Sequence, residues 1–260
     1  MALSVNDLLR DLSYRYYVSS NSTESNKIEN SIDSLSRLLK TDLGDKITKI
    51  VKFGSYDRET MLPRKYDDNS DVDLMIVFNQ NICGVKLETF RNWLRTFAEI
   101  RYPRSYVKKA FPTVVLELNH IKFDLVPTIA LMQKYHILCN KNGLTKTDPE
   151  RFNKQQYECN KRHNSILKPI IRLLKAWNSS KNKPYSSYHL EMFISFLDLK
   201  GHTIESGFFY AIDKMSLDKL SNASKKKVEH LKDDKNWLET YLKQGDEKNC
   251  LIRLKRILPF

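Results

Sequence analysis

The sequence predicts an α+β fold, in which a small mixed sheet with flanking helices is followed by an all-helical lobe. Two observations support this fold class. Short runs rich in Val, Ile and Phe, which are typical of strands, fall between residues 47 and 128. Beyond about residue 131 the apolar residues recur at the three- and four-residue spacing of helices. We therefore expect two domains, residues 1–130 and residues 131–260.

The elements of the first half have recognisable boundaries. Ile28, Ile32, Leu35 and Leu39 are spaced by three or four residues, which predicts a helix that Gly44 ends. The expected elements are helices over 4–18, 26–43 and 86–100, and strands over 47–53, 71–78, 113–118 and 121–128. A polar loop is expected over 62–70. The last two strands are separated by two residues, which is typical of a hairpin.

The second half is expected to begin with one long helix over residues 156–178. This helix should be kinked at Pro169, because proline cannot donate the backbone hydrogen bond of a helix interior. Further helices are expected over 188–199, 204–215 and 237–242. The lysine-rich stretch 222–227 is expected to be an exposed connection.

Positive charge is concentrated in the later part of the chain. The net charge is +13, and residues 101–260 hold 30 of the 44 lysines and arginines, whereas residues 1–100 are nearly neutral. Such asymmetry is typical of proteins that bind a polyanion, such as nucleotide phosphates, RNA or DNA. A solvated, lysine-rich surface is the alternative.

The composition excludes several classes of protein. Gly (7) and Pro (8) are too sparse for collagen-like or low-complexity chains. The four cysteines are scattered without a CxxC pair, which indicates neither a zinc ribbon nor a disulfide framework. No apolar stretch approaches the length of a membrane span, and the first residues lack a signal core. We expect a cytoplasmic protein with reduced thiols and no membrane partner.

Three aspartates are the candidate catalytic residues and metal ligands. Asp71 and Asp73 lie two apart in one strand, so alternation places both carboxylates on the same face. Asp124 lies in another apolar strand, where an unpaired carboxylate is costly. Neighbouring carboxylates repel, and three of them converging would bind two Mg²⁺ or Mn²⁺ ions. Alternatively, Asp71 is a turn residue, and Asp73 and Asp124 face solvent.

Gly54 and Ser55 end the strand that precedes these aspartates. Glycine lets the backbone approach a phosphate closely, and a serine hydroxyl can hold one; an ordinary turn is the alternative. The order of FGSYDRET at 53–60, DVDLMIVF at 71–78 and FDLVP at 123–127 resembles the active-site signature of DNA polymerase β-type nucleotidyltransferases. It is most similar to the branch that contains cyclic GMP–AMP synthase, oligoadenylate synthases and the bacterial CD-NTases. Glu59 stands where the bacterial pattern usually has glycine.

The resemblance implies roles for particular residues. Residues 1–130 would form the polymerase β-like catalytic core, and residues 131–260 would complete the nucleotide-binding cleft. Asp71, Asp73 and Asp124 would hold the two metal ions and carry catalysis. Gly54, Ser55 and Arg58 would contact the nucleotide phosphates.

The expected long helix adds further candidates. Lys161, Lys168, Arg172 and Lys175 fall within a narrow arc, which predicts a basic ridge opposite the apolar face of the helix; a solvated face is the alternative. Residues 167–178 resemble the family helix whose lysine contacts the donor triphosphate, and Lys175 matches that lysine. Residues 186–191 resemble the start of the next family helix. There Ser187 matches the phosphate-contacting serine and Tyr188 matches the tyrosine that stacks on the base.

Three functions are compatible with this pattern. The first is a metal-dependent nucleotidyltransferase that joins NTPs, ATP among them, into a cyclic or linear oligonucleotide second messenger for bacterial antiphage signalling. It implies a monomer that needs no nucleic acid, and a downstream effector that binds the product rather than the enzyme. The second is an enzyme that adds nucleotides to RNA or tRNA. The third is a degenerate binding module, against which the three intact aspartates argue.

Overall fold

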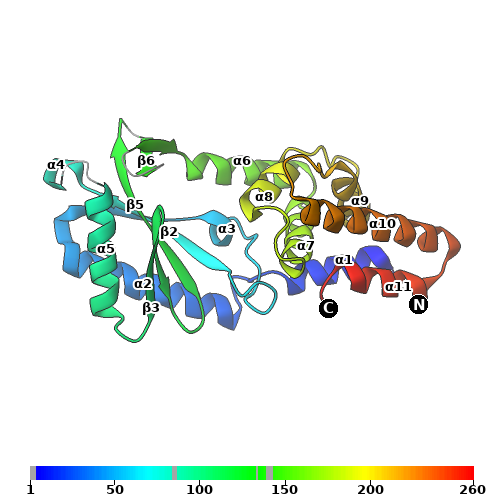
Figure 1. Cartoon of the computed structure of the whole chain (residues 1–260), viewed down its shortest axis with the longest axis horizontal. Helices are drawn as coiled ribbons and strands as arrows, with labels where there is room; N and C mark the ends of the chain where they lie inside the picture. Colours follow the sequence, from blue (N-terminus) through cyan, green and yellow to red (C-terminus); the bar gives the residue numbers. More distant parts are fainter. Residues whose placement is uncertain (1–3, 84–86, 133, 139–142) are drawn as a thin grey trace. The chain divides into compact units, whose positions relative to one another are not determined.

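The computed structural model describes residues 4–83, 87–132, 134–138 and 143–260, and the chain forms two compact units (Figure 1). The sheet unit comprises Val18–Met61 and Asn69–Gln155, and the helical unit comprises Met1–Tyr17, Leu62–Asp68 and Gln156–Phe260. This division differs from the expected one at residue 130. The difference arises because the first helix packs with the later helices, and because the chain after residue 130 adds two strands to the sheet.

The described residues of the sheet unit form a mixed sheet, as predicted, but with seven strands where four were expected. Its strands are β1 (Ile47–Phe53), β2 (Asp71–Phe78), β3 (Tyr106–Ala110), β4 (Thr113–Glu117), β5 (Lys122–Leu131), β6 (Lys134–Leu138) and β7 (Leu144–Thr147). Its helices are α2 (Thr23–Leu43), α3 (Gly54–Asp57), α4 (Gln80–Cys83) and α5 (Leu87–Arg101), with a 3₁₀ turn η1 (Gly44–Lys46). The strand order is β1-β2-β5-β4-β3, and β6 pairs with both β5 and β7. Only β2 and β5 pair in parallel among these strands.

At the start of β2, alternation separates apolar side chains on one face of the sheet from carboxylates on the other. Val72 and Leu74 of β2 are fully buried, and they join a cluster with α2 and α5. Phe78 at the end of β2 stacks on Phe90 of α5, with 4.3 Å between the ring centroids. The other face carries the aspartates at the start of β2. The packing of the two helices on one face therefore leaves the aspartate face for chemistry.

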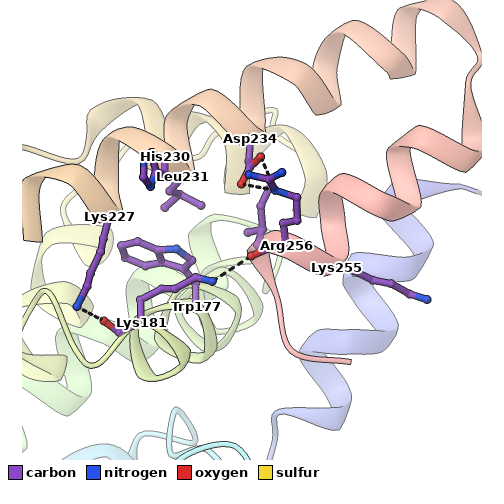
Figure 2. Close-up of a pocket in the computed structure, with 9 residues that line it drawn as sticks. Trp177, Lys181, Lys227, His230, Leu231, Asp234, Lys255 and Arg256 are labelled. Carbon is purple, nitrogen blue, oxygen red and sulfur yellow. Dashed lines mark hydrogen bonds and ion pairs between the residues drawn. The ribbon is translucent and has the colours of Figure 1, made fainter.

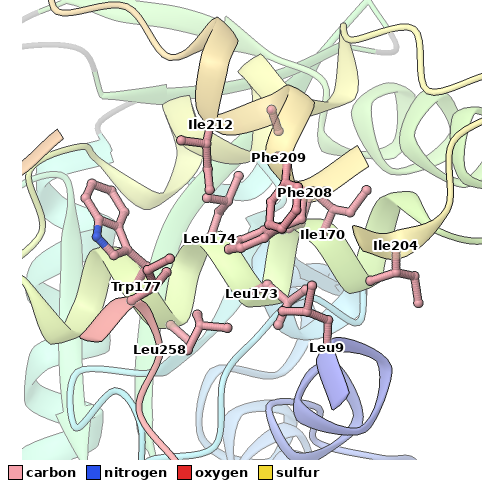
Figure 3. Packing of buried hydrophobic residues seen from close by; sticks show 14 of the residues in the cluster. Leu9, Ile170, Leu173, Leu174, Trp177, Ile204, Phe208, Phe209, Ile212 and Leu258 are labelled. Atoms are coloured by element: carbon pink, nitrogen blue, oxygen red, sulfur yellow. The ribbon is translucent and has the colours of Figure 1, made fainter. Parts of the chain in front are cut away.

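The helical unit is built around one buried helix. It contains α1 (Val5–Arg15), the later part of α6 (Pro149–Arg162), α7 (Leu167–Ser180), α8 (Ser187–Ser195), α9 (Ile204–Lys214), α10 (Asn222–Gln244) and α11 (Glu247–Ile257). Helix α7 buries every side chain from Ile170 to Asn178. Figure 3 shows Leu173, Leu174 and Trp177 of α7 among Leu9 of α1, Phe208 of α9 and Leu258. In the described part of the chain no helix is both long enough and apolar enough to cross a membrane.

The expected long helix over 156–178 is wrong, because α6 and α7 are separate helices. The chain breaks between them at residues 163–166, where Asn164 and Ser165 adopt left-handed backbone angles (φ 51° and 62°). Pro169 does not kink the helix. It is the third residue of α7, and an amide in the first turn of a helix needs no partner within that helix.

Further elements differ from expectation, among them β3, which was not expected as a strand. Strands β6 and β7 fall in the region expected to be helical; they are short, and β7 is largely exposed, so neither leaves an apolar pattern in the sequence. Residues 222–227 are not a connection but the first turns of α10, because lysine is a good helix former and the helix packs through Val228 and Leu231. Helix α11 was not expected as an element.

Two cysteines can be described fully. Cys159 and Cys250 are free and buried, and burial raises the pKa of both thiols. Cys139 and the side chain of Cys83 lie outside the described residues.

The basic ridge expected on the long helix is also wrong. Lys161 lies on α6, and Arg172 and Lys175 of α7 are buried, each about 5% exposed. The Arg172 Nε donates to the carbonyl of Ser13 at 2.9 Å. The Lys175 Nζ lies 2.7 Å from Glu191 Oε1 of α8, which is itself 1% exposed. These charges are tolerated in the core because each has a partner.

The buried pair of Lys175 and Glu191 yields a prediction about stability. Glu191→Ala should lower the free energy of unfolding by about 3–5 kcal/mol, because it leaves a buried ammonium unpaired. The double variant Lys175→Met with Glu191→Leu should recover at least half of that loss, because it removes both charges and keeps the volume. Urea unfolding followed by circular dichroism measures both values. A double variant as unstable as the single one would show that the cost does not come from the unpaired charge.

Candidate active site

The structure places the predicted site residues in both units. The sheet unit holds Gly54, Ser55, Arg58, Asp71, Asp73 and Asp124, and the helical unit holds Lys175, Ser187 and Tyr188. The first group comes from the segment after β1, from the start of β2 and from β5. The second group comes from α7 and from the start of α8.

The parallel register of β2 and β5 brings the aspartates together. Asp73 is directly opposite Asp124, and Asp71 is opposite Lys122, two residues before Asp124. Asp71 and Asp73 are half-buried, whereas Val72 between them is fully buried on the other face. The prediction that both carboxylates of β2 share one face is therefore confirmed, and Asp124 joins them on it.

The Asp124 carboxyl shows the electrostatic consequence of this clustering. Its pKa is raised to about 6, first by burial and then by the negative charge of Asp71. The positive charge of Lys122 and a hydrogen bond from the Thr113 side chain oppose this shift without cancelling it. The charged form of Asp124 is therefore less favourable than in water, and a cation bound beside it would offset that cost.

Gly54 is fixed by its closeness to Asp73. Its φ of +77° lies in the left-handed region, and a Cβ placed on it would lie 1.8 Å from the Asp73 Oδ2. Any side chain would therefore collide with this carboxylate. Glycine at this position is what allows the end of β1 and the carboxylate of β2 to lie against one another.

The chain after Gly54 folds back on Ser55. The Ser55 carbonyl accepts hydrogen bonds from the amides of Thr60 (2.9 Å) and Met61 (3.0 Å). This tight return requires Glu59 to adopt a left-handed conformation, with a φ of 61°. Glycine, which is usual at this position in the bacterial pattern, adopts that conformation readily, whereas Glu59 adopts it at some cost in strain.

Arg58 is anchored within the sheet unit. Its guanidinium lies 4.9 Å from the centre of the Phe152 ring, and its Nη1 lies 3.3 Å from Asn153 Oδ1. The Arg58 side chain is buried, so these contacts describe a residue that packs the segment after β1 against the start of α6. Its predicted contact with phosphate stays a prediction.

Sequence reasoning missed the residues that hold the segment after β1. The Tyr56 hydroxyl donates to Glu29 Oε1 at 2.9 Å and lies 3.0 Å from the Ser25 hydroxyl, both on α2. Glu29 also pairs with Lys52 of β1 at 3.0 Å. Single polar residues on a helix give no sequence signal that they contact a segment about twenty to thirty positions later in the chain.

The aspartates suit a divalent cation in their chemistry. Carboxylate oxygens are the ligands that Mg²⁺ prefers, and the pKa of Asp124 is raised first by burial and then by the negative charge of Asp71. As the side chains stand, no group of three or more His, Cys, Asp or Glu residues in the described ranges is arranged to hold a metal ion. The two-metal site over Asp71, Asp73 and Asp124 thus stays a prediction.

The candidates of the helical unit differ in accessibility. Ser187 is the first residue of α8, whose N-cap Ser186 accepts a hydrogen bond from the His189 amide at 3.2 Å. Tyr188 is 52% exposed, so its ring is available to a ligand. Lys175 is buried against Glu191, so any phosphate contact would require its ammonium to extend beyond that pair.

Similarity to known proteins agrees with the fold and with the motif. A probable cyclic nucleotide synthase of Bacillus cereus (strain VD146) is 27% identical over 181 residues, which cover 55% of this chain and 54% of that protein. The chain thus spans about half the length of this curated relative.

Solved structures share the fold over nearly the whole chain. The CD-NTase CdnG of Bradyrhizobium diazoefficiens, in complex with GTP, has a TM-score of 0.71 at 11% identity and covers 98% of this chain and 99% of its own. The CdnE cyclic dinucleotide synthase of Elizabethkingia meningoseptica has a TM-score of 0.61 at 16% identity, over 90% and 86% of the two chains. These likenesses confirm the predicted α+β fold of the polymerase β-like type.

The family is shown by the sequence itself. Residues 3–160, which include the segment after β1 and all three aspartates, match the family described as the Second Messenger Oligonucleotide or Dinucleotide Synthetase domain. This match covers more than half of the chain and agrees with the resemblance to the CD-NTases. The chain therefore belongs to the second messenger oligonucleotide or dinucleotide synthetase (SMODS) family.

Proposed function

We propose that the protein is a metal-dependent nucleotidyltransferase that joins NTPs, ATP among them, into a cyclic or linear oligonucleotide second messenger. The observation that carries the proposal is the set of three aspartates on one face of the β2–β5 pair, beside a glycine that leaves room for one of the carboxylates. The family match, the cyclic nucleotide synthase relative and the GTP held by the related CdnG structure support this choice of reaction and substrate.

Asp71, Asp73 and Asp124 would hold two Mg²⁺ or Mn²⁺ ions. Such ions supply Lewis-acid stabilisation of the attacking hydroxyl and of the departing pyrophosphate. The contribution of the chain is to present ionised carboxylates in a fixed register. Asp124, whose pKa is about 6, would be mostly ionised at neutral pH.

The remaining candidates would bind the nucleotide. Ser55 would hold a phosphate next to the aspartates, since the two hydrogen bonds to its carbonyl fix the backbone there. Lys175 and Ser187 would contact the donor triphosphate, and the exposed ring of Tyr188 would stack on a base. In a bacterium the product would act in antiphage signalling through an effector that binds the product.

The direct test is incubation of the purified protein with all four NTPs and Mg²⁺ or Mn²⁺, followed by mass spectrometry. We expect discrete products that resist phosphatase when they are cyclic, formed without added nucleic acid. Products that appear only with added RNA would support nucleotide addition to RNA instead.

Removing the paired carboxylates should abolish synthesis and preserve the fold. Asp71→Asn with Asp73→Asn keeps the shape of both side chains and removes the negative charge that binds cations. The melting temperature without metal should rise slightly, because repulsion with Asp124 is relieved. Activity within about tenfold of the parent would contradict the metal assignment, since metal-dependent transfer relies on these ligands for several kcal/mol.

Gly54→Ala tests the contact with Asp73. It should abolish synthesis and lower stability, because the methyl group collides with the carboxylate. Gly201→Ala is the matched control, since Gly201 has the same φ of +77° and nothing lies within 4 Å of its added Cβ. Both variants carry the same backbone strain, of about 1–2 kcal/mol. Equal activity of the two variants would show that closeness to Asp73 is not required.

The pKa of Asp124 predicts how stability depends on pH. Its folded pKa of about 6 lies above the unfolded value, so between about pH 4 and pH 6 the folded state binds more protons. The free energy of unfolding should therefore fall by up to about 3 kcal/mol as the pH rises through this window in EDTA. Asp124→Asn should remove this decrease in the free energy of unfolding with rising pH. Urea unfolding at pH 4.5 and pH 7 measures it in the parent and in the variant. Mg²⁺ should raise the melting temperature of the parent more at pH 7.5 than at pH 5. The same dependence on pH in the variant as in the parent would show that it does not come from the Asp124 carboxyl.

A further inference from the structure

A cavity of about 360 Å³ lies within the helical unit, between the end of α7 and one face each of α10 and α11 (Figure 2). Three apolar side chains line it, Trp177, Leu231 and Ile257, one from each helix. Lys227, His230, Leu231 and Asp234 of α10 all line it, at the spacing of one helix face. The cavity is therefore part of the packing of these three helices, and its volume is that of a small organic ligand.

The rest of the lining is strongly cationic. Lys181, Lys227, Lys255 and Arg256 all line the cavity, and Asp234 is its only carboxylate among the described residues. Asp234 is already paired, with Arg253 Nη1 at 2.8 Å and with Arg256 Nε at 3.1 Å. It therefore leaves no negative charge to compensate the lysines.

The two inner lysines are bound to backbone carbonyls rather than to carboxylates. The Lys227 Nζ donates to the carbonyl of Lys181 at 2.8 Å, and the Lys181 Nζ donates to the carbonyl of Arg256 at 3.2 Å. Neither lysine has an ion pair with a described residue. Both carbonyls lie at helix C-termini, each of which carries only about half a negative charge. Excess positive charge thus remains, even with these ends counted.

We propose that this cavity binds a phosphorylated small molecule of about nucleotide size. Lysine and arginine are the residues that bind phosphate through charge-assisted hydrogen bonds, and an ammonium bonded to one carbonyl retains two further donors. The apolar side chains of Trp177, Leu231 and Ile257 would contact the organic part of the ligand. None of the residues that line this cavity is one of the three aspartates or one of the candidate nucleotide-binding residues.

The site also accounts for part of the charge asymmetry of the sequence. A solvated surface would leave lysines pointing into water, whereas Lys181 and Lys227 are only partly exposed and are held in place by carbonyls. Fixed, partly desolvated cations lose less entropy and less hydration when an anion binds. The ligand class therefore follows from the placement of these groups rather than from the net charge.

The experiment measures AMP binding by calorimetry in EDTA, in protein carrying Asp71→Asn and Asp73→Asn. Hydrogen–deuterium exchange should then show protection of α10 and α11. Lys227→Met should weaken AMP about ten- to a hundredfold, because it removes one charge-assisted contact. Lys226→Met is the matched control, because Lys226 is exposed and does not line the cavity. The affinity of this variant for AMP should differ less than twofold from that of the parent.

AMP, inorganic phosphate and adenosine together distinguish the contribution of the phosphate to binding from that of the organic part. AMP should bind more tightly than inorganic phosphate, and adenosine should not bind measurably. Adenosine binding as tightly as AMP would overturn the proposal, as would equal effects of Lys227→Met and Lys226→Met in variants with matching melting temperatures. Protection confined to β2, β5 and α8 would assign AMP to the candidate active site and also overturn it. None of these readouts involves synthesis, so the proposed enzymatic function can fail or succeed independently.

Discussion

The register between β2 and β5 is the constraint on which the sheet unit depends. It sets Asp73 beside Asp124, and alternation then places Asp71 on the same face. Carboxylates on one surface repel one another, and the pKa of Asp124 is raised first by its burial and then by the negative charge of Asp71. The apolar residues that alternate with them pack against α2 and α5, and this packing holds the strands in a register that the charges oppose.

The core of the helical unit contains buried cationic side chains. Helix α7 is the centre of its core, and yet it carries Arg172 and Lys175 inside that core. A backbone carbonyl receives one of them and Glu191 the other. At the C-cap of the same helix, Lys181 lines a cavity and has no carboxylate partner among the residues that the structure describes. The buried cations of α7 and the lysine at its C-cap thus all donate to groups of the fold, and only Lys181 borders the cavity proposed to bind a ligand.

Sequence reasoning was most successful where the signal is local. The bounds of β1 and β2, the end of α2 at Gly44 and the shared face of Asp71 and Asp73 follow from spacing within a few residues. The break between α6 and α7 was missed because left-handed Asn164 and Ser165 are not marked by glycine, whereas Pro169 suggested a kink elsewhere. Burial of Lys175 could not be foreseen, since its partner Glu191 belongs to another helix. The metal ions and nucleotide contacts stay predictions, because they depend on ligands as well as on the chain.

The discontinuous helical unit has a consequence for the order in which the protein is made. Its first helix leaves the ribosome early, but Asn6 accepts a hydrogen bond from the amide of Glu205, and the Tyr16 hydroxyl donates to the carbonyl of Pro259. The sheet unit has all of its residues once Gln155 has been synthesised. Leu9 and Leu12 of α1 stay exposed until the later residues that bury them have been synthesised. During that time the nascent chain must avoid aggregation through these side chains or be shielded by a chaperone. Translation speed beyond residue 155 therefore sets how long that apolar helix stays exposed.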